Sequence, residues 1–342
     1  MTLNFGIAGT GKMAAAMLPA IRLAGAEAFA VSSHDIERAR AFAAAQGIAR
    51  SFGSLAEMLR EPAFDAVYIA GATGAHARDA IIALEAGKHV LCEKPFAMNA
   101  DEGARVIGAA KASGKLFMEG LWTHFLPAYQ RMHALMQERG VGAPKHLAAA
   151  YGYPATKALR PRLFDKTDGG VILDLGVYPV SLSLRLLGSV KSVDAQVARN
   201  EDGVDTHLAV QLVHDSGAVS QLGASFDALM SNAATLSCAS GSITMPPPLF
   251  GAEAVIVEQF SPAAPGPAAS GLKAALKKNP LLRKLKRAMG GGEHHPYGAD
   301  QYLPQMLHFI GLIAAGKTES DVASHALSLD TLRVLDRIRE GR

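Results

Sequence analysis

Residues 84–95 read Leu-Glu-Ala-Gly-Lys-His-Val-Leu-Cys-Glu-Lys-Pro. The apolar, Ala- and Leu-rich run before them ends at Gly87, and glycine is a good residue to end a helix because it enters the left-handed region without steric cost. The run from His89 to Cys92 is typical of a buried parallel strand. The turn Glu93-Lys94-Pro95 follows at the carboxyl end of that strand, which is where ligands bind in open α/β sheets.

The charged turn Glu93-Lys94-Pro95 has two interpretations. Most Glu-Lys pairs are solvated surface charges, and composition alone would place this pair among them. We favour a lysine held over a bound ligand, because the turn follows a nucleotide-binding pattern of strands and helices and emerges where a cofactor would lie. We therefore assign Glu93 and Lys94 to a cofactor site.

Length and composition limit the class of protein. The chain has 342 residues, which exceeds one ordinary core and predicts two domains. Its net charge of +3 is too small to indicate a nucleic-acid partner. Of its two cysteines, Cys92 falls in a predicted buried strand and the other is Cys238, so we expect no disulfide framework. The chain shows no signal-peptide pattern and no apolar run of membrane-spanning length, so we expect a soluble cytoplasmic protein.

A glycine-rich turn follows the first predicted strand, Leu3 to Ala8. Gly9-Thr10-Gly11-Lys12-Met13-Ala14 matches the Gly-x-Gly-x-x-Gly/Ala turn of dinucleotide-binding units, and a helical run continues to Leu23. The first glycine permits the tight turn, the second lets the backbone approach a pyrophosphate, and the small third residue allows close helix–strand packing. The helix start favours the anion, so we assign residues 9–13 to the cofactor.

The end of the second predicted strand, Ala28 to Ser32, indicates which dinucleotide fits. NAD-binding chains place Asp or Glu there for the ribose hydroxyls, whereas this chain has Ser33 and His34, with Arg38 further on. Asp35 comes late and is better placed to cap the following helix, Ile36 to Gln46. We therefore predict NADP over NAD, and assign Ser33, His34 and Arg38 to its 2′-phosphate end.

Strands and helices continue to alternate up to residue 122, which predicts a doubly wound parallel sheet, or Rossmann domain. The strand Phe64–Ala70 ends in the loop Gly71-Ala72-Thr73-Gly74-Ala75-His76, and we assign Gly71, Ala72 and Thr73 to the cofactor. His76 either contacts the cofactor or caps the helix Ala77–Ala86. Trp122 is also assigned to the cofactor. The other predicted elements are a helix at 55–60 capped by Ser54, a helix at 101–113 and a strand at 115–121.

The pattern changes after residue 122, and we place the domain boundary there, with a substrate-binding and dimerisation domain over 123–342. Successive strands without intervening helices predict a mostly antiparallel sheet in an α+β domain. The predicted strands are 146–153, 190–199, 207–214, 218–225, 236–239, 241–245 and 254–259. The predicted helices are 127–139, 171–187, 300–315 and 321–340.

Residues 261–299 interrupt this domain. The first ten are rich in Pro, Ala and Gly, and residues 271–289 carry seven Lys and Arg side chains without an acid. A solvated insertion with a helix broken at Pro280 is the interpretation we favour. An amphipathic basic element that contacts an anionic partner is the alternative.

A second candidate constellation opens the helix predicted at 171–187. Asp174 and Tyr178 are four residues apart and share a face of a helix. If that face meets Lys94, a carboxylate, a phenol and an ammonium form an acid/base set for moving a hydride between a carbinol and a nicotinamide. We expect Lys94 to favour the tyrosine anion and lower its pKa. The alternative is that Asp174 caps the helix and Tyr178 packs in the core.

Three segments together carry a family resemblance. Gly9-Thr10-Gly11, residues 85–95 and Asp174-x-Gly176-x-Tyr178 resemble the glucose–fructose oxidoreductase/inositol dehydrogenase/MocA (Gfo/Idh/MocA) family, over nearly the whole chain except 261–299. The run 117–127, Tyr178 in place of a common histidine, and the run 316–320 resemble the branch that contains dimeric dihydrodiol dehydrogenase.

The resemblance implies an N-terminal Rossmann domain, a C-terminal domain whose sheet often mediates dimerisation, and Lys94 and Tyr178 as the catalytic pair beside Asp174. The Lys94–Pro95 peptide is often cis in this family. The chain departs from the family pattern in three places: residues 71–73 replace Thr-Pro-Asn, and His124 and His34 each replace an arginine.

Our expectation is an NADP-dependent oxidoreductase, with NAD possible, that acts on a sugar, polyol or vicinal diol. Tyr178 is the general acid/base, Lys94 polarises the reacting oxygen, and His124, Asp174 and Tyr178 contact substrate. No residue is assigned to a metal, and we expect a homodimer or higher homo-oligomer. The alternatives are a non-catalytic dinucleotide sensor of the same fold, and a reductase of a non-sugar carbonyl or an imine.

Overall fold

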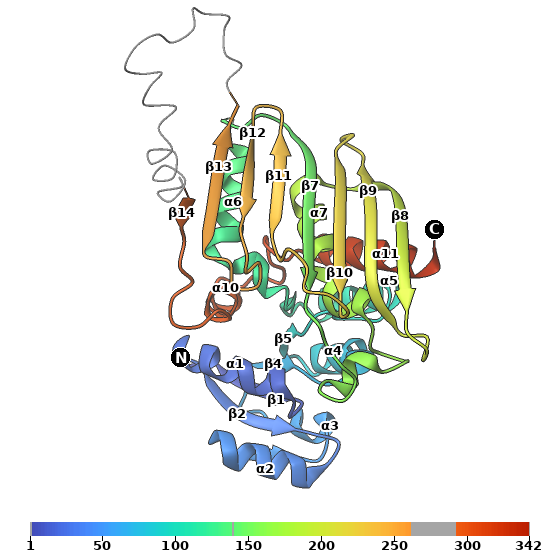
Figure 1. Ribbon diagram of the computed structural model, residues 1–342. Coiled ribbons are helices and arrows are strands. Elements are labelled where there is room, and N and C mark those ends of the chain that lie inside the picture. Colours follow the sequence, from blue (N-terminus) through green and yellow to red (C-terminus); the bar gives the residue numbers. More distant parts are fainter. Residues whose placement is uncertain (1, 139, 261–291, 342) are drawn as a thin grey trace, which may run out of the picture.

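The computed structural model describes residues 2–138, 140–260 and 292–341 and contains two sheets (Figure 1). The first is a parallel sheet in the order β3-β2-β1-β4-β5-β6. Its strands are β1 (Asn4–Ala8), β2 (Glu27–Ser32), β3 (Arg50–Phe52), β4 (Ala66–Ile69), β5 (His89–Cys92) and β6 (Phe117–Glu119). The helices between them are α1 (Lys12–Leu23), α2 (Ile36–Gln46), α3 (Leu55–Met58), α4 (His76–Glu85) and α5 (Ala100–Ser113).

The second sheet has the order β14-β13-β12-β11-β7-β10-β9-β8 within the described residues. Its neighbours pair antiparallel except β7 and β10, which run parallel. Its strands are β7 (Pro144–Gly152), β8 (Val190–Arg199), β9 (Asp205–His214), β10 (Val219–Ser225), β11 (Ala234–Cys238), β12 (Gly241–Met245), β13 (Ala254–Gln259) and β14 (Gly292–His294). The helices of this half are α6 (Pro127–Gln137), α7 (Val177–Leu187), α10 (Leu303–Ala314) and α11 (His325–Glu340).

Helices α6 and α7 pack on the same face of the second sheet, where Figure 1 shows them behind its strands. Helix α11 packs on α7 and also on α5 of the first half, and α10 contacts α1. Direct bonds join the halves here: Asp336 accepts a hydrogen bond from the N–H of Ala100 at 2.8 Å, and His325 Nε2 lies 3.1 Å from the carbonyl oxygen of Phe117. The end of the chain therefore ties the second half to the Rossmann sheet.

The predicted fold class, a Rossmann sheet followed by an α+β half with a mostly antiparallel sheet, is confirmed. The predicted bounds of 36–46, 89–92, 190–199, 241–245 and 254–259 are also confirmed. The short edge strands β3 and β14 were not predicted, because three residues carry too little periodicity to stand out. The division at residue 122 stays a prediction. Residues 261–291, which hold most of the predicted basic insertion, lie outside the described residues.

Three predicted helix starts are wrong by three residues or more. The last helix begins at His325 rather than at residue 321, because Ser324 is its N-cap and accepts a hydrogen bond from the N–H of Leu327 at 3.1 Å. The helix predicted from residue 300 begins at Leu303. The helix predicted from residue 171 opens with a π-turn over 172–176 before α7 begins.

Candidate active site

The turn after β1 is shaped by Gly9. Its φ is +120°, and a Cβ there would lie 2.6 Å from the carbonyl oxygen of Ala70 on the neighbouring strand end, so only glycine fits. Helix α1 starts at Lys12 after Gly11, with no side-chain cap and no acidic residue in its first turn. A helix start of this kind presents N–H groups and a positive dipole end to an anion. The predicted dinucleotide turn, residues 9–13, therefore has the geometry that a pyrophosphate requires.

The tip of β2 presents Ser33, His34 and, one helical turn on, Arg38. The side chains of His34 and Arg38 are exposed, and Ser33 is buried. The predicted N-cap role of Asp35 is confirmed, since its carboxylate accepts hydrogen bonds from the N–H groups of Glu37 at 2.9 Å and Arg38 at 3.4 Å. The carboxylate nearest this strand end is therefore engaged with its own helix.

The loop after β4 joins the cofactor side to the second half of the chain. Gly71 is exposed, Ala72 and Thr73 are partly buried, and the N–H of Gly74 donates to Asp168 Oδ2 at 3.3 Å. His76 does not cap α4, because the N-cap residue is Ala75 and no side chain bonds there.

The imidazole of His76 instead supports the turn that follows β5. It is buried, and Nδ1 lies 2.8 Å from the carbonyl oxygen of Pro95. Burial lowers the pKa of His76, so the ring is neutral at neutral pH. Because a carbonyl oxygen only accepts, Nδ1 carries the proton in this bond.

Lys94 meets the second candidate constellation. The Lys94–Pro95 peptide is cis, as the family resemblance implied. Lys94 Nζ donates to the carbonyl oxygen of Asp174 at 2.6 Å and to Asp174 Oδ1 at 2.9 Å, and it lies 4.8 Å from the centroid of the Tyr178 ring. The predicted set therefore assembles from the end of β5 and the start of α7, 80 residues apart in the chain.

The segment that presents Asp174 is held from β9. Gly170 has a φ of +98°, and a Cβ there would lie 2.5 Å from Asp205 Oδ2. Asp205 Oδ1 also accepts a hydrogen bond from the N–H of Ile172 at 2.7 Å. The π-turn Ile172–Gly176 follows, and such turns are frequent at functional sites.

Electrostatics keep Lys94 charged and Tyr178 neutral. Burial lowers the pKa of Lys94, but the Asp174 carboxylate and Tyr178 outweigh it, so the pKa stands above its ordinary value. Burial raises the pKa of Tyr178 above its ordinary value, although Lys94 acts in the opposite direction. The expectation that Lys94 brings the tyrosine pKa below its usual range is therefore wrong for the free protein, because burial has the larger effect.

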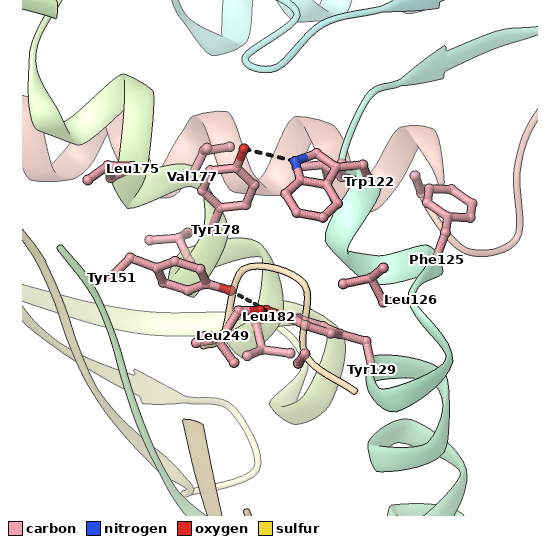
Figure 2. Packing of buried hydrophobic residues seen from close by; sticks show 14 of the residues in the cluster. Trp122, Phe125, Leu126, Tyr129, Tyr151, Leu175, Val177, Tyr178, Leu182 and Leu249 are labelled. Atoms are coloured by element: carbon pink, nitrogen blue, oxygen red, sulfur yellow. Dashed lines mark hydrogen bonds between the residues drawn. The ribbon is translucent and has the colours of Figure 1, made fainter. Parts of the chain in front are cut away.

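Aromatic rings surround Tyr178, which is 5% exposed. Figure 2 shows the indole of Trp122 beside its hydroxyl, where Trp122 Nε1 donates to Tyr178 Oη at 3.1 Å. Tyr151 stacks on the Tyr178 ring at 5.3 Å, and Phe250 packs edge-on at 5.0 Å. Tyr151 also bonds to the hydroxyl of Tyr129. The sequence singled out Trp122 but none of the other three rings, because no local spacing links them to Tyr178.

Two buried carboxyl groups lie under the turn after β5. Glu93 is 4% exposed and its Oε1 accepts a hydrogen bond from the hydroxyl of Tyr68 at 2.5 Å. Glu119, at the end of β6, is 1% exposed and its Oε1 accepts from the N–H of Phe96 at 3.2 Å. Burial raises the pKa of Glu93 above its ordinary value and that of Glu119 to about 7. Both groups fix the backbone that carries Lys94, and only Glu93 was assigned from the sequence.

His124 lies in the core. It is 1% exposed, its Nε2 lies 3.0 Å from the hydroxyl of Ser181 on α7, and its ring packs edge-on against Tyr129. Burial lowers the pKa of His124 to about 3, so the ring is neutral. A packing role is the simpler interpretation of this placement, and the substrate contact predicted for His124 stays a prediction.

Comparison with known proteins agrees with this architecture. Residues 3–121 match the model described as "Oxidoreductase family, NAD-binding Rossmann fold", and residues 129–244 match the "GFO/IDH/MocA C-terminal domain". The chain belongs to the Gfo/Idh/MocA family of oxidoreductases. A curated family relative, trans-1,2-dihydrobenzene-1,2-diol dehydrogenase of Xenopus laevis, is 30% identical over 266 residues, which cover 75% of this chain and 79% of the relative.

Two solved structures share the Gfo/Idh/MocA fold. The 3-ketoreductase KijD10 from Actinomadura kijaniata, in complex with NADP and TDP-benzene, has a TM-score of 0.81 at 22% identity and covers 100% of this chain and 98% of its own. Levoglucosan dehydrogenase in complex with NADH and levoglucosan has a TM-score of 0.81 at 20% identity, and the match covers 100% of this chain and 97% of the dehydrogenase chain. Among the described residues, no helix has the length and apolarity needed to span a membrane, and no group of metal-ligating side chains is found.

Proposed function

We propose that this oxidoreductase transfers a hydride between a nicotinamide and the carbon of a carbinol or carbonyl in a vicinal diol, polyol or sugar. One observation carries the proposal. Lys94 follows a strand of the dinucleotide-binding half, and its ammonium bonds Asp174 and lies over the ring of Tyr178, both from the second half. An ammonium and a phenol that share one site suit the exchange of a hydroxyl proton.

Each group has a separate role. In the reduction direction Tyr178 donates its proton to the substrate oxygen, and in the oxidation direction it accepts that proton. Lys94 polarises the same oxygen: an ammonium has three N–H donors, and Asp174 takes two of them. Asp174 orients the lysine and keeps it charged. The aromatic rings around Tyr178 exclude water from the site.

The dinucleotide site fits an NAD(P) cofactor on two observations: the cradle that a Cβ at Gly9 would fill, and the uncapped start of α1. Residues 9–13 would hold the pyrophosphate, and residues 71–73 would line the ribose and nicotinamide side, with buried His76 and Glu93 beneath the turn that carries Lys94. The bound cofactor supplies the hydride acceptor or donor.

We propose a preference for NADP. Exposed His34 and Arg38 with the hydroxyl of Ser33 suit a 2′-phosphate, while Asp35 is engaged in capping α2 and is poorly placed for the ribose hydroxyls of NAD. The substrate class follows the named activity of the Xenopus laevis relative and the levoglucosan bound in the structure of levoglucosan dehydrogenase.

Reduced-cofactor absorbance with NADP or NAD and a panel of dihydrodiols, polyols and sugars tests the proposal. We expect turnover with at least one of these classes, higher kcat/KM with NADP, and a loss of at least about 100-fold in kcat in Lys94→Ala and Tyr178→Phe with little change in cofactor affinity. Full activity in both variants would refute the assigned roles.

We also propose a homodimer through the second sheet. The face opposite α6 and α7 carries mostly uncharged side chains, among them the small Ala148, Ala150 and Ala209 and the polar Gln211 and Gln221. Such a face can pack closely on a copy of itself. Light scattering on the purified protein should give twice the chain mass, and a monomer at micromolar concentration would contradict this assembly.

A further inference from the structure

The hydrogen bond between Trp122 and Tyr178 has a fixed direction. An indole N–H only donates, so in the 3.1 Å contact Tyr178 Oη is the acceptor. The hydrogen of the Tyr178 hydroxyl therefore cannot point at Trp122. Lys94 Nζ lies over the ring face of Tyr178, and two of its donors are engaged with Asp174.

The rings of Trp122 and Tyr178 are both held by packing, so the direction of the hydrogen bond between them is fixed. Trp122 is 5% exposed, stacks on Phe250 with an interplanar angle of 18°, and meets Tyr302 edge-on at 5.1 Å. The ring of Tyr178 packs against Tyr151 and against the same Phe250. These five rings come from five separate parts of the chain, which makes independent rotation of either partner costly in such a packed site.

We propose that Trp122 is a positioning residue, whose N–H directs the Tyr178 proton toward the substrate oxygen and then holds the tyrosinate oxygen once that proton has left. The inference rests on the proposed function. In the reduction direction the substrate carbon gains a hydride that a reduced nicotinamide would supply, which would leave the nicotinamide oxidised. The π electron pair of the substrate carbonyl forms the new O–H bond with the proton of Tyr178, whose own O–H bond breaks, so the negative charge stays on Tyr178. A hydrogen bond to an ionised oxygen is stronger than one to a neutral phenol, so Trp122 acts mainly on the step in which the charge forms.

Trp122 is the only tryptophan in the chain, which permits a substitution of one atom. Growth on β-(benzothiophen-3-yl)alanine replaces the indole N–H by sulfur at this position alone and keeps the ring size. We expect kcat to fall about tenfold to hundredfold, with an unchanged Kd for NADPH by calorimetry. In the oxidation direction the rise of kcat with pH should move to higher pH, because the tyrosinate has lost a donor.

A second replacement of Trp122 keeps the inference testable if the protein that carries the sulfur analogue misfolds. 5-Fluorotryptophan keeps the N–H and makes it more acidic, so the same rise should move to lower pH. Unchanged kcat and pH profiles in both labelled proteins would overturn the inference. So would a weaker Kd for NADPH with normal kcat, which would make Trp122 a cofactor contact only.

A readout that needs no turnover separates this inference from the proposed function. The single indole ¹⁵N–¹H resonance should shift upfield in Tyr178→Phe relative to the wild type, because its acceptor is gone. A wild type that turns over no diol, polyol or sugar defeats the proposed function. An unmoved indole resonance defeats the hydrogen bond on which the inference depends.

Discussion

Replacement of Asp174 by Asn isolates the ion pair at the centre of the site. The change keeps the backbone carbonyl and one side-chain oxygen, both of which accept hydrogen bonds from Lys94 Nζ, at 2.6 and 2.9 Å, and removes only the charge. Two unit charges 2.9 Å apart interact by about 6 kcal/mol at an effective dielectric constant of about 20. Because Asp174 is 29% exposed, solvent screens part of this energy, and we expect a net loss of about 2–3 kcal/mol.

That loss predicts a decrease in kcat/KM of roughly 30- to 150-fold in Asp174→Asn. The pH dependence gives a second signature. Without the carboxylate, burial lowers the pKa of Lys94 unopposed by its main partner, so kcat should fall at alkaline pH as the lysine loses its proton. The wild type keeps a charged Lys94 over the same range.

Steady-state kinetics at several pH values measures both effects. Asp165→Asn is the matched control, because Asp165 lies on the same segment, is exposed, and bonds the N–H of Thr167 rather than Lys94. It should retain wild-type kinetics. If Asp174→Asn had the same kcat/KM as the control and showed no fall in kcat at alkaline pH, the ion pair would have no part in catalysis.

Three further predictions follow from separate observations. Gly9→Ala should raise the cofactor Kd at least about tenfold in calorimetry, because the added Cβ would lie 2.6 Å from the carbonyl oxygen of Ala70 and because a φ of +120° disfavours alanine. An unchanged Kd would contradict the assignment of this turn to the cofactor. Glu119 has a pKa raised by burial to about 7 from an ordinary 4.5, so the folded state favours its neutral form, and the stability that this form contributes is lost as pH rises from about 4.5 through 7. In urea unfolding, the wild type should therefore lose about 3 kcal/mol of stability between pH 4.5 and pH 8 beyond any change seen in Glu119→Gln. Parallel curves of stability against pH for the two proteins would refute this prediction. Arg38→Ala should lower kcat/KM for NADP about tenfold and leave that for NAD within about twofold; equal losses with both would exclude a 2′-phosphate contact.

The dinucleotide half was predictable because its information is local. The turn at Gly9 lies between an apolar strand and an Ala-rich helix, and His89 to Cys92 has the apolar run of a buried parallel strand. Each feature occupies fewer than about 20 consecutive residues, where periodicity and turn chemistry are strongest. The meeting of Lys94 with Asp174 and Tyr178 was predicted in the same way, from short motifs in context.

The rest of the site depends on contacts between distant segments. Tyr151, Phe250 and Tyr302 reach the site from β7, from the loop after β12 and from the start of α10, and no spacing in the sequence joins them. The sign of the Tyr178 pKa was missed for a related reason, because a single cation is visible in a motif while the burial that outweighs it depends on packing of the whole site.

The π-turn before α7 was missed because it is set from outside its own segment. The Asp205 carboxylate on β9 fills the space where Gly170 lacks a side chain, and it accepts the N–H of Ile172. Residues 171–187 alone read as one continuous helix. Their first turn departs from that pattern because a strand residue more than 30 positions away binds it.

A crystal structure with NADP and a non-reacting diol bound tests the central claim most directly. We predict that one diol oxygen lies about 3 Å from both Lys94 Nζ and Tyr178 Oη, with its carbon over C4 of the nicotinamide. A nicotinamide bound away from both groups, or a diol whose oxygens reach neither of them, would contradict the account.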